Sequence, residues 1–379
     1  MAYFDNNATT MPCEAAVLAA RRAMEELWHN PSSVHRPGQA ARAAVELARQ
    51  DLALLIRANA RDLILTSSGT ESIDLAIRGV LAPSKRRVLV TTPVEHAAVR
   101  DLAEHLGRQG VEVRTLPLIP GGRVDVSALA GVIDESVAMV SVQWANNETG
   151  LVQPLAEIAR AARAAGAVMH SDGVQWVGKE TTDVHTAGVD LLSFSAHKFH
   201  GVKGCGVLWV RPGVRLSPTT LGTQELGRRG GTEAVPAILA AGAAAREAAA
   251  WLASPEGRTR IRAARDLLEE RILARIPDAV VNAGGERLWN TSNIGFPGLQ
   301  AEALLMLLSE RGVCASAGAA CSSGSLEPSP VLLAMGVPER IAHGSIRLSL
   351  SRYTTQREVG ECADTLVASV QRLRASGGV

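Results

Sequence analysis

The sequence predicts a mixed α/β protein, with a large domain built on a mixed, mostly parallel sheet and a smaller α+β domain. Short apolar runs alternate with helical segments along residues 63–252, which is typical of strands joined by crossover helices. The 379 residues exceed what one hydrophobic core usually contains. The segment Ser254-Pro255-Glu256-Gly257 then interrupts the pattern. We therefore expect a large domain at residues 12–255 and a small domain formed by residues 1–11 and 256–379.

The expected helices are recognised by the spacing of their apolar residues and by their first residues. Pro12 suits the first turn of a helix that runs to about residue 27, because its missing N–H would have no partner there. An Ala-rich amphipathic pattern predicts the next helix at residues 39–56. Further helices of the large domain are expected at residues 72–81, 96–109, 154–165 and 234–252. Helices of the small domain are expected at residues 259–276, 301–310 and 355–374.

The expected strands are apolar runs that are too short for helices. In the large domain they lie at residues 63–66, 87–91, 111–116, 138–142, 167–170, 189–194 and 204–210. In the small domain they lie near residue 280 and at residues 292–296 and 345–350. The alternation of strands and helices in the large domain predicts mostly parallel neighbours.

Composition excludes several classes of protein. The formal net charge is +1 and aromatic residues make up 3%, which argues against a nucleic-acid or membrane-surface partner. We expect no apolar stretch of transmembrane length. The N-terminal residues lack the pattern of a signal peptide, so a cytoplasmic protein is expected.

Cysteine and histidine spacing argues against disulfides and metal. Five cysteines without a Cys-x-x-Cys pair favour neither a disulfide framework nor a zinc site, and Cys205 and Cys362 are interpreted as small buried hydrophobes. His197 and His200 are not followed by a second ligand pair, so no metal is expected.

The stretch Ser193 to Gly201 is the most informative part of the chain. Lys198 follows the expected strand 189–194, at the end where open α/β sheets bind their ligands. A desolvated lysine there would have a lowered pKa, as a lysine that forms a Schiff base requires. The alternative is an ordinary surface lysine on a loop.

Two further strand ends carry compatible chemistry. The strand 63–66 opens through Ser67-Ser68-Gly69-Thr70 into a helix, which makes an anion-binding helix N-terminus. Plain N-capping by Ser68 or Thr70 is the alternative. Asp172 follows the strand 167–170 and precedes Lys198 by 26 residues. A lysine, a carboxylate against a pyridine nitrogen and a phosphate cup are what pyridoxal phosphate needs.

Cys321 differs from the other cysteines. Its neighbours from Ala315 to Ser325 are almost all Ala, Ser and Gly, so we expect a mobile, exposed loop. A thiol on such a tether suits a nucleophile that collects a group and passes it on.

These features occur within a series of ordered motifs. They are residues 5–10 (DNNATT), 30–33 (NPSS), 69–72 (GTES), 95–96 (EH), 146–148 (NNE), 171–175 (SDGVQ), 195–198 (SAHK), 231–233 (GTE), 321–329 (CSSGSLEPS) and 345–347 (SIR). Over essentially its whole length the chain resembles a cysteine desulfurase of the NifS/IscS type, and residues 144–150 and 350–355 are closest to the nitrogenase-associated NifS-like group. The resemblance implies the pyridoxal-phosphate-dependent transferase fold (aminotransferase class V, fold type I).

The resemblance also implies residue roles. Lys198 would bind pyridoxal phosphate covalently and move protons, Asp172 would pair with the ring nitrogen, and Cys321 would take the sulfur as a persulfide. Gln175 would reach the ring hydroxyl, and His96 would stack on the ring and act as acid or base. The substrate carboxylate would be bound by Asn147 and Arg347. Thr232 would contact the phosphate in the other subunit of a homodimer. The remaining residues that would bind the phosphate or the rest of the cofactor are Gly69, Thr70, Asn147, Ser195 and His197.

The implied enzyme converts L-cysteine to L-alanine and supplies sulfur to an iron–sulfur scaffold protein, for nitrogenase clusters in the NifS-like group. Alternatives are another pyridoxal phosphate enzyme, such as a selenocysteine lyase or an aminotransferase, and a non-enzymatic scaffold paralogue.

The chain departs from relatives at Thr223 and Leu226, where histidine and arginine are often found. It also has Gly69 where some relatives have alanine, which we expect only to loosen the phosphate cup.

Overall fold

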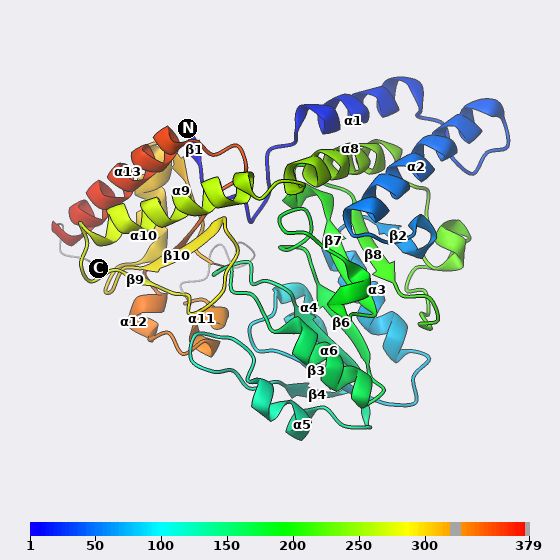
Figure 1. Ribbon diagram of the computed structural model, residues 1–379, viewed down its shortest axis with the longest axis horizontal. Coiled ribbons are helices and arrows are strands. Elements are labelled where there is room, and N and C mark those ends of the chain that lie inside the picture. Colours follow the sequence, from blue (N-terminus) through cyan, green and yellow to red (C-terminus); the bar gives the residue numbers. More distant parts are fainter. Residues whose placement is uncertain (319–326, 376–379) are drawn as a thin grey trace.

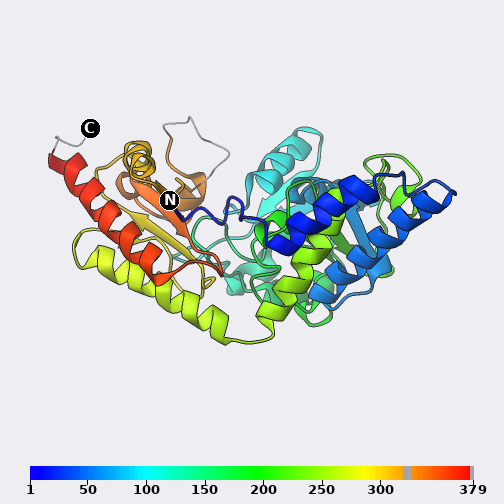
Figure 2. The same cartoon turned by 90° about the horizontal axis from the view of Figure 1, so that it is seen from above.

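The computed structural model describes residues 1–318 and 327–375 and contains two lobes (Figure 1). Seen from above, the chain passes from one lobe to the other where α8 (Val235–Leu252) is followed by α9 (Glu256–Leu273) (Figure 2). The N-terminal strand β1 (Ala2–Tyr3) and the C-terminal helix α13 (Gln356–Ala375) both belong to the smaller lobe.

The larger lobe is organised around a seven-stranded sheet in the order β2-β8-β7-β6-β5-β3-β4. Strand β8 is antiparallel to both β2 and β7, and the other pairs are parallel. The strands are β2 (Leu63–Thr66), β3 (Val88–Thr91), β4 (Glu112–Thr115), β5 (Val137–Gln143), β6 (Val168–Asp172), β7 (Leu191–Ser195) and β8 (Gly206–Val210). The mixed, mostly parallel sheet predicted from the alternation of elements is confirmed.

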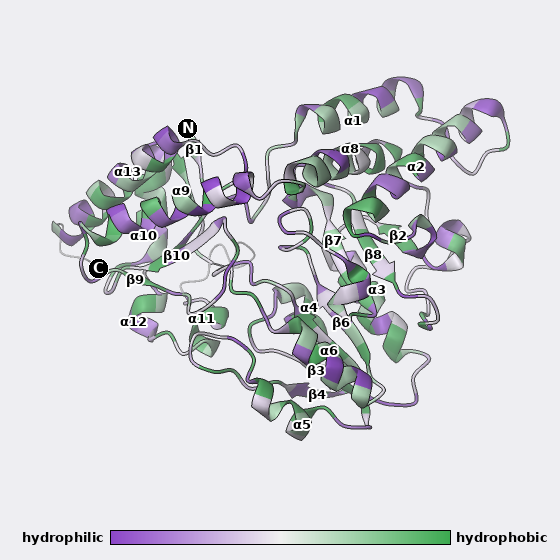
Figure 3. Ribbon diagram, in the orientation of Figure 1, coloured by the Kyte–Doolittle hydropathy of each residue, from purple (hydrophilic) through white to green (hydrophobic). Residues whose placement is uncertain are grey.

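Helices cover both faces of this sheet, which explains why its strands are apolar without alternation. Ile64 of β2 packs with α3 (Gly69–Leu81) and α4 (Ala97–Arg108) on one face. Its neighbours Leu63 and Leu65 pack on the other face, whose helices include α1 (Glu14–Glu26), α2 (Arg36–Leu55), α6 (Leu155–Ala164) and α8. Coloured by hydropathy, the strands are largely apolar, whereas the outer helices carry polar stripes (Figure 3). Two further short helices are α5 (Leu129–Val132) and α7 (Val184–Ala187).

Helix α8 has the length and composition of a membrane-spanning helix. By length and composition, the expectation that no apolar stretch reaches transmembrane length is therefore wrong. The helix is rich in alanine, and 56% of it is buried inside the protein, where it packs against α1 and α2. Small side chains allow helices to approach closely, and this packing accounts for the apolar run as part of the core.

The smaller lobe combines a three-stranded antiparallel sheet in the order β12-β10-β9 with helices α9, α10 (Ala301–Glu310) and α13. Its strands are β9 (Val280–Val281), β10 (Thr291–Gly295) and β12 (Ser345–Ser349). Strand β1 pairs in parallel with β11 (Val313–Cys314), and two short helices follow, α11 (Pro330–Ala334) and α12 (Glu339–Ala342).

The two lobes have separate main hydrophobic cores, and a smaller cluster packs Val94 against Val331 and Leu332 across the proposed boundary, so the division at residue 255 stays a prediction. One core contains residues between 13 and 252, and another contains residues 2 and 4 together with residues between 261 and 370. The expected helices and strands lie within a few residues of their positions in the structure. Helix α2 begins earlier than expected, at Arg36, because Nδ1 of His35 accepts a hydrogen bond from the backbone N–H of Gly38 and caps it.

Candidate active site

A cavity of about 330 Å³ opens where the carboxyl ends of β3, β5, β6 and β7 meet the N-terminus of α3. Parallel strands place their carboxyl ends at one edge of a sheet, which is where ligands of open α/β sheets bind. Arg347 of β12 lines the same cavity from the smaller lobe, so both lobes contribute to it. Its volume is in the range of small-molecule and cofactor sites.

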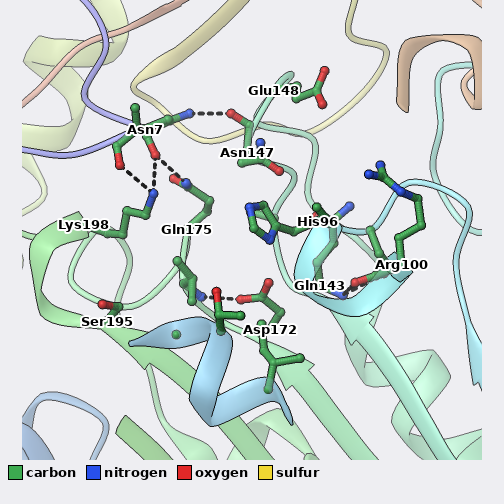
Figure 4. Close-up of a pocket in the computed structure, with 18 of the residues that line it drawn as sticks. Asn7, His96, Arg100, Gln143, Asn147, Glu148, Asp172, Gln175, Ser195 and Lys198 are labelled. Carbon is green, nitrogen blue, oxygen red and sulfur yellow. Dashed lines mark hydrogen bonds between the residues drawn. The ribbon is translucent and has the colours of Figure 1, made fainter. Parts of the chain in front are cut away.

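Asp172 is the last residue of β6 and is buried at the floor of this cavity (Figure 4). Its Oδ1 accepts a hydrogen bond of 2.9 Å from the backbone N–H of Val174. Burial raises the pKa of Asp172, while His96, this N–H and Lys198 act to lower it. A cationic group in the cavity would therefore stabilise the carboxylate.

Lys198 follows β7 on a single turn of 3-10 helix and extends into the cavity from the side opposite Asp172 (Figure 4). Its Nζ donates to the backbone carbonyl oxygens of Asn7 and Ala8, at 2.7 Å and 2.8 Å. The N-terminal segment therefore holds the end of the lysine side chain in place. The prediction that the ends of β6 and β7 present an acid and a lysine to one pocket agrees with this geometry.

The N-terminus of α3 forms another wall of the cavity. The hydroxyl of Ser68 accepts a hydrogen bond from the N–H of Glu71, so the capping alternative holds, and Ser68, Gly69 and Thr70 also line the cavity. The expected effect of Gly69 needs correction. A Cβ added there would lie 2.7 Å from Cγ2 of Val174, so the glycine allows α3 to pack closely on the turn after Asp172.

Ser195 and His197 also line the cavity, and Cβ of Ser195 would lie 3.6 Å from a Cβ added at Gly69 of α3. The hydroxyl of Ser195 donates to the carbonyl oxygen of Cys205 at 3.1 Å, so it would have to turn to donate to a phosphate. Nδ1 of His197 lies 3.1 Å from the hydroxyl of Thr9. Burial lowers the pKa of His197 to about 4, with a further effect from Lys198. A neutral imidazole that accepts at Nδ1 carries its proton on Nε2.

His96 caps α4, since its Nδ1 accepts a hydrogen bond of 3.1 Å from the backbone N–H of Ala98. Because a backbone N–H can only donate, Nδ1 is the acceptor and Nε2 carries the proton. Burial lowers the pKa of His96, against the opposing effect of Asp172. His96 is therefore a neutral imidazole near pH 7, with one N–H available.

Gln175 and Asn147 reach the cavity from the loops after β6 and β5. Nε2 of Gln175 donates to the backbone oxygen of Asn7 at 2.9 Å, and its Oε1 accepts from Lys179 at 2.6 Å. The backbone oxygen of Asn147 accepts from the amide of Asn7 and from Arg347.

Arg347 is 1% exposed, and its guanidinium is already extensively bonded. Nη2 pairs with Oδ1 of Asp5 at 2.6 Å, and Nη1 donates to the carbonyl oxygens of Asn147 and Gly318. Its buried Nε has no partner among the described residues. Asp5 is thus a competitor for any carboxylate that Arg347 would bind.

Two site residues of the sequence analysis are not placed in the cavity. Cys321 lies outside the described residues. Thr232 is exposed and lines a separate depression with Glu225 and Arg229. Leu226, one of the positions at which the chain departs from its relatives, follows Glu225. Glu225 has a φ of 50° and forms a buried ion pair with Arg49, which holds the loop around residue 225 in place. Cys205 and Cys362 are fully buried, as expected.

The structure adds cavity residues to which the sequence analysis assigned no role: Asn7, Glu95, Arg100, Gln143 and Glu148. Glu95 is fully buried, and it accepts from the hydroxyl of Thr92 at 2.6 Å and from the N–H of Gln143. Burial raises the pKa of Glu95 to about 8. Asn7, Glu95 and Glu148 do lie in the motifs quoted above, so position in a motif was the available signal.

The comparisons with known proteins agree with this geometry. Residues 2–361 match the family model described as Aminotransferase class-V. "Cysteine desulfurase 2" of Trichormus variabilis is 45% identical over 98% of this chain and 94% of that protein. "Cysteine desulfurase NifS" of Azotobacter vinelandii is 43% identical over 98% of this chain and 93% of that protein. The chain belongs to the cysteine desulfurases of the aminotransferase class-V family.

The fold of this cysteine desulfurase agrees with solved structures. A structure described as "NIFS-LIKE PROTEIN" superposes with a TM-score of 0.91 and 33% identity, covering 98% of this chain and 99% of that one. The predicted resemblance and fold class are therefore confirmed. Cysteine desulfurases of this family depend on pyridoxal phosphate. The residue roles implied by the resemblance stay proposals.

Proposed function

We propose that the protein is a pyridoxal-phosphate-dependent sulfurtransferase that converts L-cysteine to L-alanine and stores the sulfur as a persulfide on Cys321. The observation that carries this proposal is the convergence of Asp172, Lys198 and the N-terminus of α3 on one cavity in a cysteine desulfurase. When bound, pyridoxal phosphate supplies an electron sink for the bonds at the α-carbon of an amino acid.

The donor set fits this cofactor in three places. Asp172 offers a buried carboxylate, and because burial raises its pKa, a cationic ring nitrogen beside it would favour its charged form. Lys198 offers the amine, held by two carbonyl oxygens. The helix terminus at Gly69 and Thr70 offers N–H groups and a positive dipole for the phosphate, and His197 lines the same cavity.

The remaining contacts orient the ring and the substrate. The N–H on Nε2 of His96 and the amide of Gln175 face the same cavity. Arg347, with Asn147 beside it, is the proposed partner of the substrate carboxylate, because a guanidinium matches a carboxylate in shape and charge. Its pairing with Asp5 and the two carbonyls keeps the guanidinium oriented before substrate binds.

The sulfur step balances without an outside oxidant. The thiolate of Cys321 attacks the sulfur of the substrate, the carbon–sulfur bond breaks, and a sulfur–sulfur bond forms. The electron pair stays with the three-carbon product, which takes up a proton and leaves as alanine. Lys198 is the proposed carrier of protons to and from the substrate.

The test measures alanine formed from L-cysteine, with and without a reducing thiol. With the thiol, alanine should form catalytically; without it, formation should stall near one equivalent per site because the persulfide is not discharged. Cys321→Ala should abolish turnover, whereas Cys314→Ala, at a half-buried cysteine in β11, should preserve it. If Cys321→Ala retains turnover, the persulfide is not formed on this residue and another pyridoxal phosphate reaction is the better assignment.

We further propose a cytoplasmic homodimer that delivers sulfur to an iron–sulfur scaffold protein, with nitrogenase clusters as the destination. Support for the dimer is an exposed apolar strip on and around α1, formed by Met11, Val17, Leu18, Met24 and Trp28. The exposed position of Thr232 also suits a contact to a partner's site rather than to its own. Size-exclusion chromatography with light scattering tests the dimer, and a monomeric active enzyme would contradict it.

A further inference from the structure

Lys179 is a buried lysine for which the proposed function has no use. It is 4% exposed and lies in the turn after β6, seven residues beyond Asp172. The chain has only four lysines among its 39 basic residues, namely Lys85, Lys179, Lys198 and Lys203. Arginine is thus the usual basic residue of this protein, and a buried lysine is an exception.

The backbone of the turn directs Lys179 inward. Gly178 has a φ of +79°, and an added Cβ there would clash with Cβ of Phe199, the residue after Lys198. The turn therefore packs directly on the segment that carries Lys198. The carbonyl oxygen of Lys179 accepts a hydrogen bond of 2.9 Å from the indole of Trp289, which anchors the turn to the smaller lobe.

The amine of Lys179 bonds to two neutral oxygens. Nζ lies 2.8 Å from Oδ1 of Asn7 and 2.6 Å from Oε1 of Gln175. In the part of the chain that the structure describes, Lys179 forms no salt bridge. Burial lowers the pKa of Lys179 well below its ordinary value, with further effects from Lys198 and Arg347. Even a neutral amine has two N–H donors, one for each of these oxygens.

These bonds decide which way two amides face. Nζ of Lys179 donates to both oxygens, and even a neutral amine has an N–H for each of them, so Oε1 of Gln175 and Oδ1 of Asn7 point toward it. Nε2 of Gln175 then donates to the backbone oxygen of Asn7 at 2.9 Å, and a flipped amide would set two acceptors against each other. The second N–H of Gln175 remains for an acceptor in the cavity.

The same contacts hold Asn7, and through it Lys198. Oδ1 of Asn7 accepts from Lys179 and Asn290, and its amide donates to Asn147 and Thr291. Its four side-chain hydrogen bonds are therefore all made. The backbone oxygen of this fixed residue accepts from Nζ of Lys198 at 2.7 Å.

We propose that Lys179 is a positioning residue, whose bonds to Gln175 and Asn7 make Gln175 a hydrogen-bond donor toward the ring oxygen of the cofactor and hold the amine of Lys198 in place. The inference rests on the proposed function for the identity of the cofactor. A donor to the ring oxyanion lowers the affinity of the neighbouring Lys198 nitrogen for its proton. Loss of the donor should therefore raise the pKa of that nitrogen.

The experiment is a pH titration of the visible absorption band of the holoenzyme. In Lys179→Met, the apparent pKa of the band should rise by about 0.5 to 1 unit, the effect of one hydrogen bond. Lys85→Met, at an exposed lysine that precedes β3 and does not line the cavity, is the matched control and should titrate like the wild type. Asp172, His96, His197 and Arg347 are unchanged in both variants, so their charges do not account for a difference.

Two more variants keep the test decisive. Gln175→Glu should also raise the pKa of the band, and combining it with Lys179→Met should add little, because both changes break the same contact. Lys179→Gln, whose amide can still donate to one oxygen, makes the measurement possible if the methionine variant does not fold, and should give a smaller rise. A folded, cofactor-loaded variant at position 179 that titrates like the wild type would overturn the proposal. A wild-type protein without a cofactor band would instead overturn the proposed function.

Discussion

His170 should make the stability of this protein sensitive to acid. It is fully buried in β6, with Nδ1 2.8 Å from the hydroxyl of Ser141 on β5 and Nε2 2.8 Å from that of Ser193 on β7. The ring therefore joins three central strands, two residues before Asp172. Burial lowers the pKa of His170 to about 3, whereas an unfolded histidine titrates near pH ~6.5.

The sign of the effect follows from proton binding. Between pH 6.5 and 3, the unfolded chain binds a proton at this residue that the folded chain does not bind, so the free energy of unfolding falls as the pH falls. From pH 7 to pH 5 the loss amounts to about 2 kcal/mol, since about 1.5 pH units lie below the unfolded pKa and each is worth about 1.4 kcal/mol.

The variant His170→Gln keeps a donor and an acceptor but does not titrate. Urea denaturation at pH 7 and pH 5 measures the fall in the free energy of unfolding for each protein, and the fall should be about 2 kcal/mol smaller in the variant than in the wild type. His185→Gln, at an exposed histidine, serves as control and should fall like the wild type. Equal losses in the wild type and His170→Gln would refute the reasoning.

Three further outcomes are expected. Arg49→Met should lower the free energy of unfolding by about 3 to 5 kcal/mol, because the buried carboxylate of Glu225 loses the arginine that it pairs with at 2.7 Å. Urea denaturation measures this loss, and a value below about 1 kcal/mol would contradict the prediction. Arg347→Lys should reduce kcat/KM for L-cysteine about 30- to 100-fold, mainly through KM, since a lysine cannot replace the oriented fork; steady-state kinetics with an unchanged KM would argue against the carboxylate role. In the third experiment, the Thr232→Ala protein is mixed with the Lys198→Ala protein and their subunits are allowed to exchange. The mixture should be more active than the sum of the two separate variants, because each mixed dimer regains one intact site. No gain after verified exchange would exclude the shared site.

Much of the site could be predicted because its main groups stand at the ends of recognisable strands. Asp172 and Lys198 each follow a short apolar run, and the Ser-Ser-Gly-Thr segment precedes a helix. The carboxyl ends of parallel strands meet at one edge, so a prediction of strands and their direction is enough to bring these groups together.

Other features depend on contacts that no local pattern encodes. Nothing near Lys179 in the sequence indicates that it is buried, or that its partners are Asn7, 172 residues away, and Gln175. Likewise, the bond between Asp5 and Arg347 joins residues 342 positions apart, and its acid reaches the arginine only because β1 belongs to the smaller lobe. The membrane-like composition of α8 is explained only by the helices that cover it.

The sequence by itself determined the mixed sheet, the strand ends at which we propose that the cofactor binds, and the family, because hydrophobic periodicity, turn residues and ordered motifs are local properties of the chain. The tertiary structure alone decided which groups are buried, which way the amides of Gln175 and Asn7 face, and what competes for Arg347. Burial and hydrogen-bond partners arise from residues distant in sequence, and they set the pKa and orientation of each group at the site.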